Sequence, residues 1–419
     1  MRLLAPLAIL LVPATLLAQQ SPGINGVGTG PGSPYGLAHR TVTSPEVLPD
    51  GRVTFRLVAP KATEVVLQGD WPGGLDLAMA RDASGQWAVT TPALQPEIWT
   101  YTFVVDGVPA LDPRNYNVLR DGTRYMNWVL VPGPASALYQ AGKVPHGTVT
   151  MTWFPPPRLK ASRRMLVYTP PGYEGGTAPY PVLYLLHGLN GTFSDWERRT
   201  QLTELLQAYR LIVVMPEGQN SWYGDSVERP ADRFETYVLD DVVADVEKQY
   251  RAIGTRHARA VAGLSMGGYG AMKFALKRPA QFLVAGSFSG AFSLVRAGAP
   301  ASPAPPPADE TPFARTVRET VTAAYGPPGS EARAANDLFA LAQQADVSRL
   351  PYLYVDCGTE DGLLRINREF AALLHERKVV FEYHELPGAH TWDYWDRQIG
   401  EFLRVLARRM PIDGPPRRP

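Results

Sequence analysis

Cysteine is almost absent from this sequence of 419 residues, because Cys357 is the only one. A single thiol excludes an intramolecular disulfide, so the fold depends on its packed core. Cys357 ends an apolar run, and we interpret it as a small buried hydrophobe rather than as a nucleophile.

An excess of one charge sign is also lacking, since 41 Lys and Arg face 40 Asp and Glu. A nucleic-acid partner needs a concentrated basic surface, so we expect none. Short basic pieces such as Arg198-Arg199 are predicted to be solvated faces. The length predicts two domains, because one ordinary core does not grow to this size.

Long hydrophobic runs are limited to one, from Leu3 to Leu17, directly after the positive start at Arg2. This pattern predicts a signal peptide over residues 1–19, and therefore a secreted or periplasmic protein of bacterial type. The run is too short for a membrane span, so we expect no stable membrane insertion after cleavage. Residues 20–41 are rich in Gly, Ser and Pro, which predicts a flexible linker.

Two patterns divide the remaining chain. Residues 42–135 contain short alternating strands, such as Val53–Leu57 and Trp99–Val105, separated by turn residues. They predict a small all-β, immunoglobulin-like sandwich. Residues 147–410 alternate strands with helices, which is typical of an α/β fold with a mostly parallel central sheet. Within them, the proline-rich segment 297–312 cannot form a helix or central strand, and is either a lid edge or a surface excursion.

The sequence Gly263-Leu264-Ser265-Met266-Gly267 matches the nucleophile elbow G-x-S-x-G. An expected strand precedes it and an expected helix follows it. Ser265 is therefore the candidate nucleophile. The backbone amide of Met266 then lies at a helix N-terminus, which stabilises a developing negative charge. The loop after an earlier strand supplies Leu189 as the second amide donor of an oxyanion hole, and His187 beside it is predicted to be structural.

The general base must be one of seven histidines. His390 is the candidate, because it lies in the loop between the last expected strand and the last expected helix. The acid comes from one short stretch with three carboxylates. Asp361 lies past a turn and is preferred, Glu360 is second, and Asp356 is third because it is still within a strand.

With these residues identified, residues 147–409 resemble the esterase D-like α/β-hydrolases, which include the feruloyl and acetylxylan esterases of carbohydrate esterase family 1, the mycolyltransferases and S-formylglutathione hydrolase. The resemblance implies Ser265, Asp361 and His390 as the triad, and the amides of Leu189 and Met266 as the oxyanion hole. The matching motifs are Leu185-Leu186-His187-Gly188, Met215-Pro216-Glu217-Gly218, Asn220-Ser221-Trp222-Tyr223, Gly263 to Gly268, Cys357-Gly358-Thr359-Glu360-Asp361 and Gly388-Ala389-His390-Thr391-Trp392.

The first domain resembles the early-set β-sandwiches related to glycogen-binding modules, on the residues around Trp87, Trp99 and Asp106-Gly107. Such a module is either structural or weakly carbohydrate-binding. The choice depends on whether Trp71, Trp87 and Trp99 are core residues or an exposed platform.

These features predict a secreted serine carboxylesterase that needs no metal and no organic cofactor. The expected substrate is a small-molecule or polysaccharide ester, above all a feruloyl or acetyl ester of plant polysaccharide. Alternatives are a siderophore esterase of the enterobactin type, an acyltransferase of the mycolyltransferase type and, remotely, a non-catalytic carbohydrate-binding protein. Candidate substrate-binding aromatics are Trp222, Tyr223, Trp392 and Trp395, although aromatic core under the loops is the alternative for Trp395 and Trp222.

Overall fold

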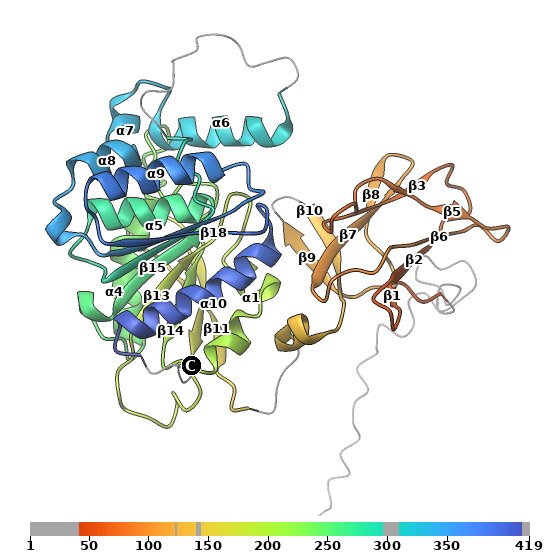
Figure 1. Ribbon diagram of the computed structural model, residues 1–419, viewed down its shortest axis with the longest axis horizontal. Coiled ribbons are helices and arrows are strands. Elements are labelled where there is room, and N and C mark those ends of the chain that lie inside the picture. The colour runs from red at the N-terminus through yellow and green to blue at the C-terminus, as the bar shows by residue number, and fades with distance from the viewer. Residues whose placement is uncertain (1–41, 122–123, 140–143, 296–309, 413–419) are drawn as a thin grey trace, which may run out of the picture.

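The computed structural model describes residues 42–412, apart from residues 122–123, 140–143 and 296–309. The predicted signal peptide (1–19) and linker (20–41) lie outside the described residues, as does the proline-rich segment up to residue 309. Figure 1 shows a small β domain beside a larger α/β domain. No helix in the described ranges is long and apolar enough to cross a membrane.

The first domain consists of two antiparallel sheets whose inward side chains alternate along each strand, as in Phe55 and Leu57 or Tyr101 and Phe103. Trp71, Trp87 and Trp99 belong to this core. One sheet has the order β1 (Glu46–Val47), β2 (Val53–Val58), β6 (Gln86–Thr90) and β5 (Ala80–Arg81). The other has the order β4 (Leu77–Ala78), β3 (Val65–Gly69), β7 (Ile98–Val105), β10 (Arg124–Leu130) and β9 (Val118–Asp121), with β8 (Val108–Ala110) paired to β7.

The second domain is built on one eight-stranded sheet. Its order is β11 (Thr148–Phe154), β12 (Arg163–Thr169), β14 (Ile212–Pro216), β13 (Val182–Leu186), β15 (Arg259–Leu264), β16 (Val284–Phe288), β17 (Tyr352–Gly358) and β18 (Phe381–Leu386). β12 runs antiparallel to both of its neighbours, and all other adjacent pairs are parallel. The mostly parallel sheet predicted from the sequence is confirmed.

Helices cover both faces of this sheet (Figure 1). One face carries α4 (Val243–Gln249), α5 (Met266–Lys277), α8 (Leu338–Gln344) and α9 (Leu364–Glu376). The opposite face carries α1 (Asp195–Arg199), α2 (Leu202–Leu206) and α10 (Trp392–Arg409). The remaining helices are α3 (Phe234–Thr236), α6 (Pro312–Tyr325), α7 (Glu331–Ala334), the π-helical η4 (Tyr237–Val242) and the 3₁₀ helices η3 (Pro134–Tyr139), η5 (Arg256–Ala258) and η6 (Val347–Arg349).

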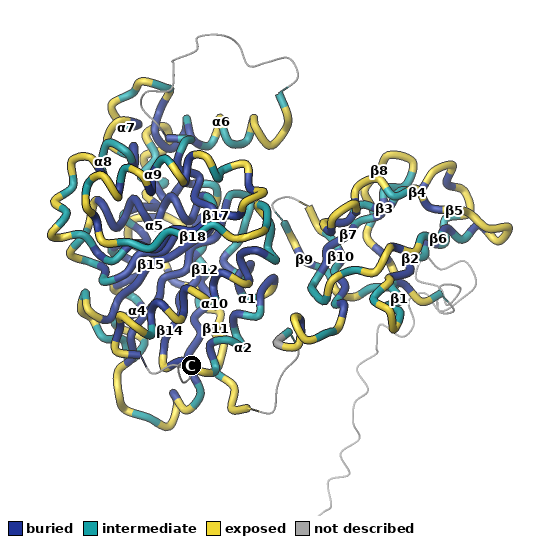
Figure 2. The backbone as a smooth tube through the Cα atoms, in the orientation of Figure 1, coloured by how far each residue is buried: buried dark blue, intermediate teal, exposed yellow. Residues whose placement is uncertain are grey.

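Helices cover both faces of the sheet, and this explains why its inner strands are apolar at successive positions. In β13, Tyr184 and Leu186 pack into the core on one side, whereas Leu183 and Leu185 pack into the core on the other. Figure 2 shows the inner strands of this sheet as buried, whereas the edge strand β18 is intermediate. The parallel strands place their carboxyl ends at one edge of the sheet, and ligands of open α/β sheets bind outside that edge.

The sequence missed α6, α7 and α8, which follow the proline-rich segment. The last residue of that segment, Pro312, begins α6 rather than staying outside a helix. Proline is tolerated there because the first helical residue needs no intrahelical N–H bond. The side chain of Thr311 caps the same end by accepting a hydrogen bond from the backbone N–H of Ala314.

Candidate active site

The predicted nucleophile lies on a sharp turn between β15 and α5. Ser265 has φ 53° and ψ −113°, which is a strained conformation for a residue with a side chain. A Cβ added to Gly263 would lie 2.5 Å from the backbone carbon of Gly267, and one added to Gly267 would lie 2.6 Å from the oxygen of Leu186. Only glycine fits at both positions, so the backbone turns tightly enough to present Ser265 Oγ.

The three predicted triad residues form one hydrogen-bonded line. Ser265 Oγ is 3.1 Å from His390 Nε2 and positioned to donate to it. His390 Nδ1 donates to Asp361 Oδ2 over 2.8 Å. The two bonds fix one tautomer, in which the imidazole can accept the serine proton.

The environment of Asp361 keeps its carboxylate ionised. Burial alone would raise the pKa of Asp361, but hydrogen bonds from His390 and from the backbone of Leu363 outweigh it and hold this pKa below its usual value. The side chain is almost fully buried, so water does not screen its attraction for the imidazole. An ionised acid at this point stabilises the imidazolium that forms when Ser265 loses its proton.

The two other carboxylates of this stretch lie elsewhere. Asp356 is fully buried within β17, and burial raises its pKa well above the usual range, with the hydroxyls of Tyr354 and Tyr394 nearby. Glu360 is exposed and accepts a hydrogen bond from the backbone N–H of Gly388. Neither is the carboxylate that contacts His390.

The two residues predicted as oxyanion donors lie in segments that adjoin the serine. Met266 is the first residue of α5, where the amide has no intrahelical partner. The loop of Leu189 also comes close to the serine, since a Cβ added to Gly188 would lie 3.6 Å from Ser265 Cβ. Two amide hydrogen bonds hold this loop: Asn190 N donates to Asn220 Oδ1 over 2.7 Å, and Asn220 Nδ2 donates to Asn190 Oδ1 over 2.9 Å. The sequence places Asn220 in a family motif but does not indicate this role for its side chain.

His187 is buried beneath the same loop. Gly218 N donates to its Nε2 over 2.9 Å, so the ring proton is on Nδ1, which donates to the oxygen of Gly188 over 2.8 Å. Burial lowers the pKa of His187 and keeps the ring neutral. Both nitrogens thus bind backbone groups, which is the structural role predicted for this residue.

The prediction that Trp222 and Tyr223 offer aromatic surface to a substrate is wrong. Their exposed fractions are 1% and 0%. Trp222 Nε1 donates to Thr320 Oγ1 of α6, and Tyr223 OH donates to the oxygen of His187. Both rings are therefore core supports beneath the site rather than parts of its surface.

The remaining two predicted aromatics lie beside the base. Trp395 is 5% exposed, and its ring meets the His390 ring edge-on with the centroids 4.9 Å apart. Trp392 is partly exposed and packs edge-on against Trp395. Of the four candidates, Trp392 retains the most accessible surface next to His390.

Arg199 does not lie on the solvated face predicted for it. Only 8% of its side chain is exposed. It lies 3.5 Å from Asp70 and 3.8 Å from Asp121, both in the first domain, and 5.1 Å above the Trp392 ring. The first domain therefore reaches, through Arg199, an aromatic ring adjacent to the triad.

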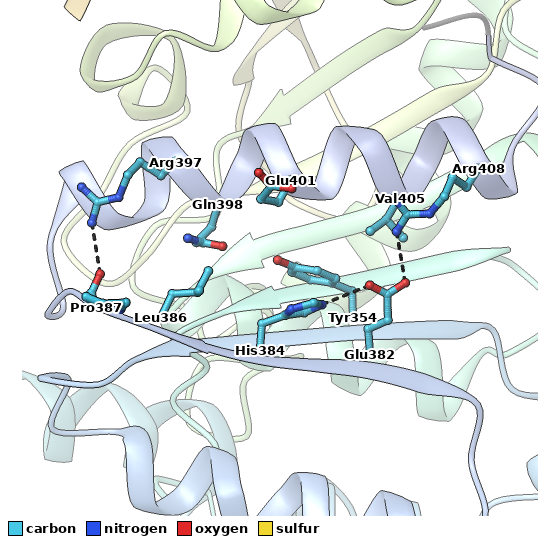
Figure 3. A pocket seen from close by; sticks show the side chains of 10 residues that line it. All are labelled: Tyr354, Glu382, His384, Leu386, Pro387, Arg397, Gln398, Glu401, Val405 and Arg408. Atoms are coloured by element: carbon cyan, nitrogen blue, oxygen red, sulfur yellow. Dashed lines mark hydrogen bonds and ion pairs between the residues drawn. The ribbon is translucent and has the colours of Figure 1, made fainter. Parts of the chain in front are cut away.

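A cavity of about 850 Å³ lies between β18 and α10, away from Ser265 (Figure 3). The charged groups that line it already have partners, and Glu401 pairs with Arg404 outside the lining. Glu382 binds His384 and Arg408, and Arg397 donates to the oxygen of Pro387. The cavity is therefore lined by charged groups that are already paired, and none of its lining residues belongs to the triad. Within the described residues, no group of three or more His, Cys, Asp or Glu side chains could hold a metal ion.

Comparisons with known proteins agree with this geometry. Residues 157–405 match the model of the Esterase family, described as "Putative esterase". The chain is 29% identical to an acetyl esterase of Caldicellulosiruptor saccharolyticus over 230 residues, covering 54% of this chain and 83% of that protein. It is 28% identical to an endo-1,4-beta-xylanase/feruloyl esterase of Xylanibacter ruminicola over 261 residues, covering 59% of this chain but only 36% of that protein.

A solved structure resembles both domains together. The enterobactin esterase FES of Shigella flexneri superposes with a TM-score of 0.56 at 17% identity, covering 85% of this chain and 93% of that one. At this identity the likeness concerns the fold alone. The family match, the sheet order and the hydrogen-bonded Ser, His and Asp agree with one another. The chain belongs to the Esterase family of serine ester hydrolases, with an α/β-hydrolase domain preceded by a β-sandwich.

Proposed function

We propose that this chain is an exported serine carboxylesterase that hydrolyses acetyl or feruloyl esters of plant polysaccharide, with Ser265, His390 and Asp361 as its triad. The observation that carries the proposal is the continuous hydrogen-bonded line from Ser265 Oγ through His390 to Asp361. The acetyl esterase and the xylanase/feruloyl esterase among its relatives support the substrate class. Export rests on the signal peptide predicted over residues 1–19.

The reaction proceeds through an acyl-enzyme. Ser265 Oγ attacks the ester carbonyl carbon while its proton passes to His390 Nε2. The amides of Leu189 and Met266 stabilise the oxyanion, and Asp361 stabilises the imidazolium. The alcohol leaves with the proton from His390. Water then attacks the acyl-enzyme, gives its proton to His390, and the acid is released as Ser265 is regenerated.

The assignment of the nucleophile is tested by Ser265→Ala. We expect hydrolysis of p-nitrophenyl acetate to fall by about 10⁶-fold in kcat, because the attacking group is removed. Circular dichroism should match that of the unchanged protein, since the loss of one hydroxyl from a partly exposed side chain leaves the core intact. Activity within a few-fold of the unchanged protein would exclude Ser265 as the nucleophile.

The substrate class is tested by parallel assays on methyl ferulate, acetylated xylan and a triscatecholate siderophore, each with and without a sugar acceptor. The proposal expects turnover of one of the first two, with water as the acyl acceptor. Preference for the siderophore would favour the enterobactin-type alternative, because the likeness to FES extends over both domains. Transfer to the sugar in place of hydrolysis would favour an acyltransferase.

A further inference from the structure

The catalytic base is carried by a short connection between β18 and α10, and this connection touches the loop that carries the acid. Thr359 N donates to the oxygen of Leu386 over 2.9 Å, and Glu360 N donates to the oxygen of Gly388 over 3.0 Å. Gly388 N in turn donates to the Glu360 carboxylate. Glu360 and Gly388 are therefore joined in both directions, once through the backbone and once through the side chain.

Two glycines allow this close approach, because they have no side chain. A Cβ added to Gly358 would overlap the carbonyl oxygen of Gly388. Gly388 itself has φ +143°, a conformation that residues with a Cβ rarely adopt. The two loops thus meet backbone to backbone, and the separation between them is set by these contacts.

The far side of the connection is held by α10. Arg397 Nη2 donates to the oxygen of Pro387 over 3.3 Å, as Figure 3 shows, and its Nη1 binds Asp393. The Tyr394 ring occupies the space that a side chain on Gly388 would need. The connection therefore cannot relax toward α10. Its position relative to Asp361 depends on its contacts with the acid loop, which are those of Thr359, Gly358 and Glu360.

Glu360 adjoins Asp361 in the sequence, and its partner Gly388 lies two residues before His390. Its other oxygen accepts from Thr359 Oγ1 over 2.8 Å, which fixes the carboxylate within its own turn. A carboxylate accepting a backbone N–H is a strong, directional contact. It connects the acid loop to the base loop at a point adjacent to the Asp361–His390 hydrogen bond.

We propose that Glu360 is a positioning residue of the triad, whose carboxylate holds the His390 loop against the Asp361 loop and so keeps the imidazole in line with Ser265. The inference rests on the proposed function, because it assigns Glu360 to the same triad. This role explains why Glu360 directly precedes Asp361 in the sequence and yet does not contact the imidazole.

The test compares Glu360→Ala with Glu360→Gln. Alanine removes the acceptor of the Gly388 N–H, so kcat on p-nitrophenyl acetate should fall by about tenfold to about 100-fold, as expected when a reacting group is slightly misplaced. KM should change less than about twofold, because the substrate contacts are unaffected. Glutamine retains an acceptor oxygen, so it should restore kcat to within about threefold of the unchanged protein.

Glu401→Ala is the matched control, because Glu401 is another exposed glutamate, carried by α10 and paired with Arg404 rather than with the loop. It should leave kcat and KM unchanged. Titration of reactive Ser265 with a fluorophosphonate counts correctly folded sites, so that kcat is expressed per active site.

Three results would overturn the proposal: full kcat per site in Glu360→Ala, an equal loss in Glu360→Gln, or a loss that vanishes once kcat is expressed per titrated site. Failure of the proposed function is a separate result, since Ser265→Ala would then keep its activity whatever Glu360 does.

Discussion

At the scale of single residues, the surroundings of a carboxylate decide its role more than its place in a motif does. Asp356, Glu360 and Asp361 lie in one short stretch. The first is buried against tyrosines and has a raised pKa, the second binds a backbone amide, and the third accepts from His390 with a lowered pKa. Only Asp361 combines ionisation with contact to the base.

Asp361→Asn is expected to reduce kcat by about 10⁴-fold, because an amide neither stabilises the imidazolium nor holds the correct tautomer. Asp356→Asn is the matched control and should keep kcat near that of the unchanged protein, since its carboxyl has a strongly raised pKa and does not contact the imidazole. Initial rates on p-nitrophenyl acetate at neutral pH measure both. A larger loss in Asp356→Asn than in Asp361→Asn would contradict this assignment.

At the scale of elements, α5 supports the site through one buried lysine. Lys273 Nζ donates to the oxygen of Tyr223 over 2.7 Å and to Tyr325 OH over 2.8 Å, and it pairs with Glu235 at 2.9 Å. Tyr325 OH donates in turn to the oxygen of Trp222 over 2.7 Å. The Trp222-Tyr223 turn has positive φ at both residues, so these contacts hold it in an unfavourable conformation.

Lys273→Met should lower the free energy of unfolding by about 3–5 kcal/mol, because it removes the fully buried cation paired with Glu235 and leaves this carboxylate only the partly exposed Lys277. Lys277→Met is the control. Lys277 also binds Glu235 but is partly exposed, so its loss should cost less than about 1 kcal/mol. Urea unfolding followed by tryptophan fluorescence compares the two variants. Equal losses in the free energy of unfolding would show that the burial of Lys273 does not increase its contribution to stability.

At the scale of the whole molecule, contacts between the two domains converge on the start of α10. Arg199 joins Asp70 and Asp121 of the sandwich to the Trp392 ring. Nearby, Tyr139 OH donates to Asp396 Oδ2 over 3.0 Å. Burial raises the pKa of Glu97 to about 7, a hydrogen bond with Tyr139 opposes the rise, and the charge of Asp396 adds to it.

This raised pKa predicts that stability depends on pH. The folded state keeps the Glu97 proton up to about pH 7, whereas the unfolded chain loses it near pH 4.5. The folded state thus binds more protons in this window, and the contribution of Glu97 to stability falls as the pH rises through it. Glu97→Gln should reduce the loss of thermal stability between pH 5 and pH 7.5, measured by calorimetry.

The control is Glu64→Gln, which changes an exposed carboxylate of the same domain. It should leave the pH dependence of the unfolding temperature as in the unchanged protein. An identical pH dependence in Glu97→Gln would contradict the raised pKa.

The sequence predicted those features that are encoded by residues close together. The elbow around Ser265 follows from two glycines and the expected strand and helix on either side, and His390 follows from the order of elements. The errors concern distant contacts. Trp222 is buried because Thr320 and Tyr325 of α6 lie over it, and Arg199 is buried because Asp70 of the other domain pairs with it. No local pattern reports such partners, since they meet only in the folded chain.

The single cysteine has a practical consequence. Cys357 is fully buried in β17, and burial raises the pKa of its thiol, so the thiolate that reacts with a maleimide does not form near neutral pH. A cysteine introduced on the surface of the sandwich is therefore the one site that a fluorophore labels. Pairing that dye with a fluorescent phosphonate on Ser265 would report the distance between the two domains in the inhibited protein, without first removing a native thiol.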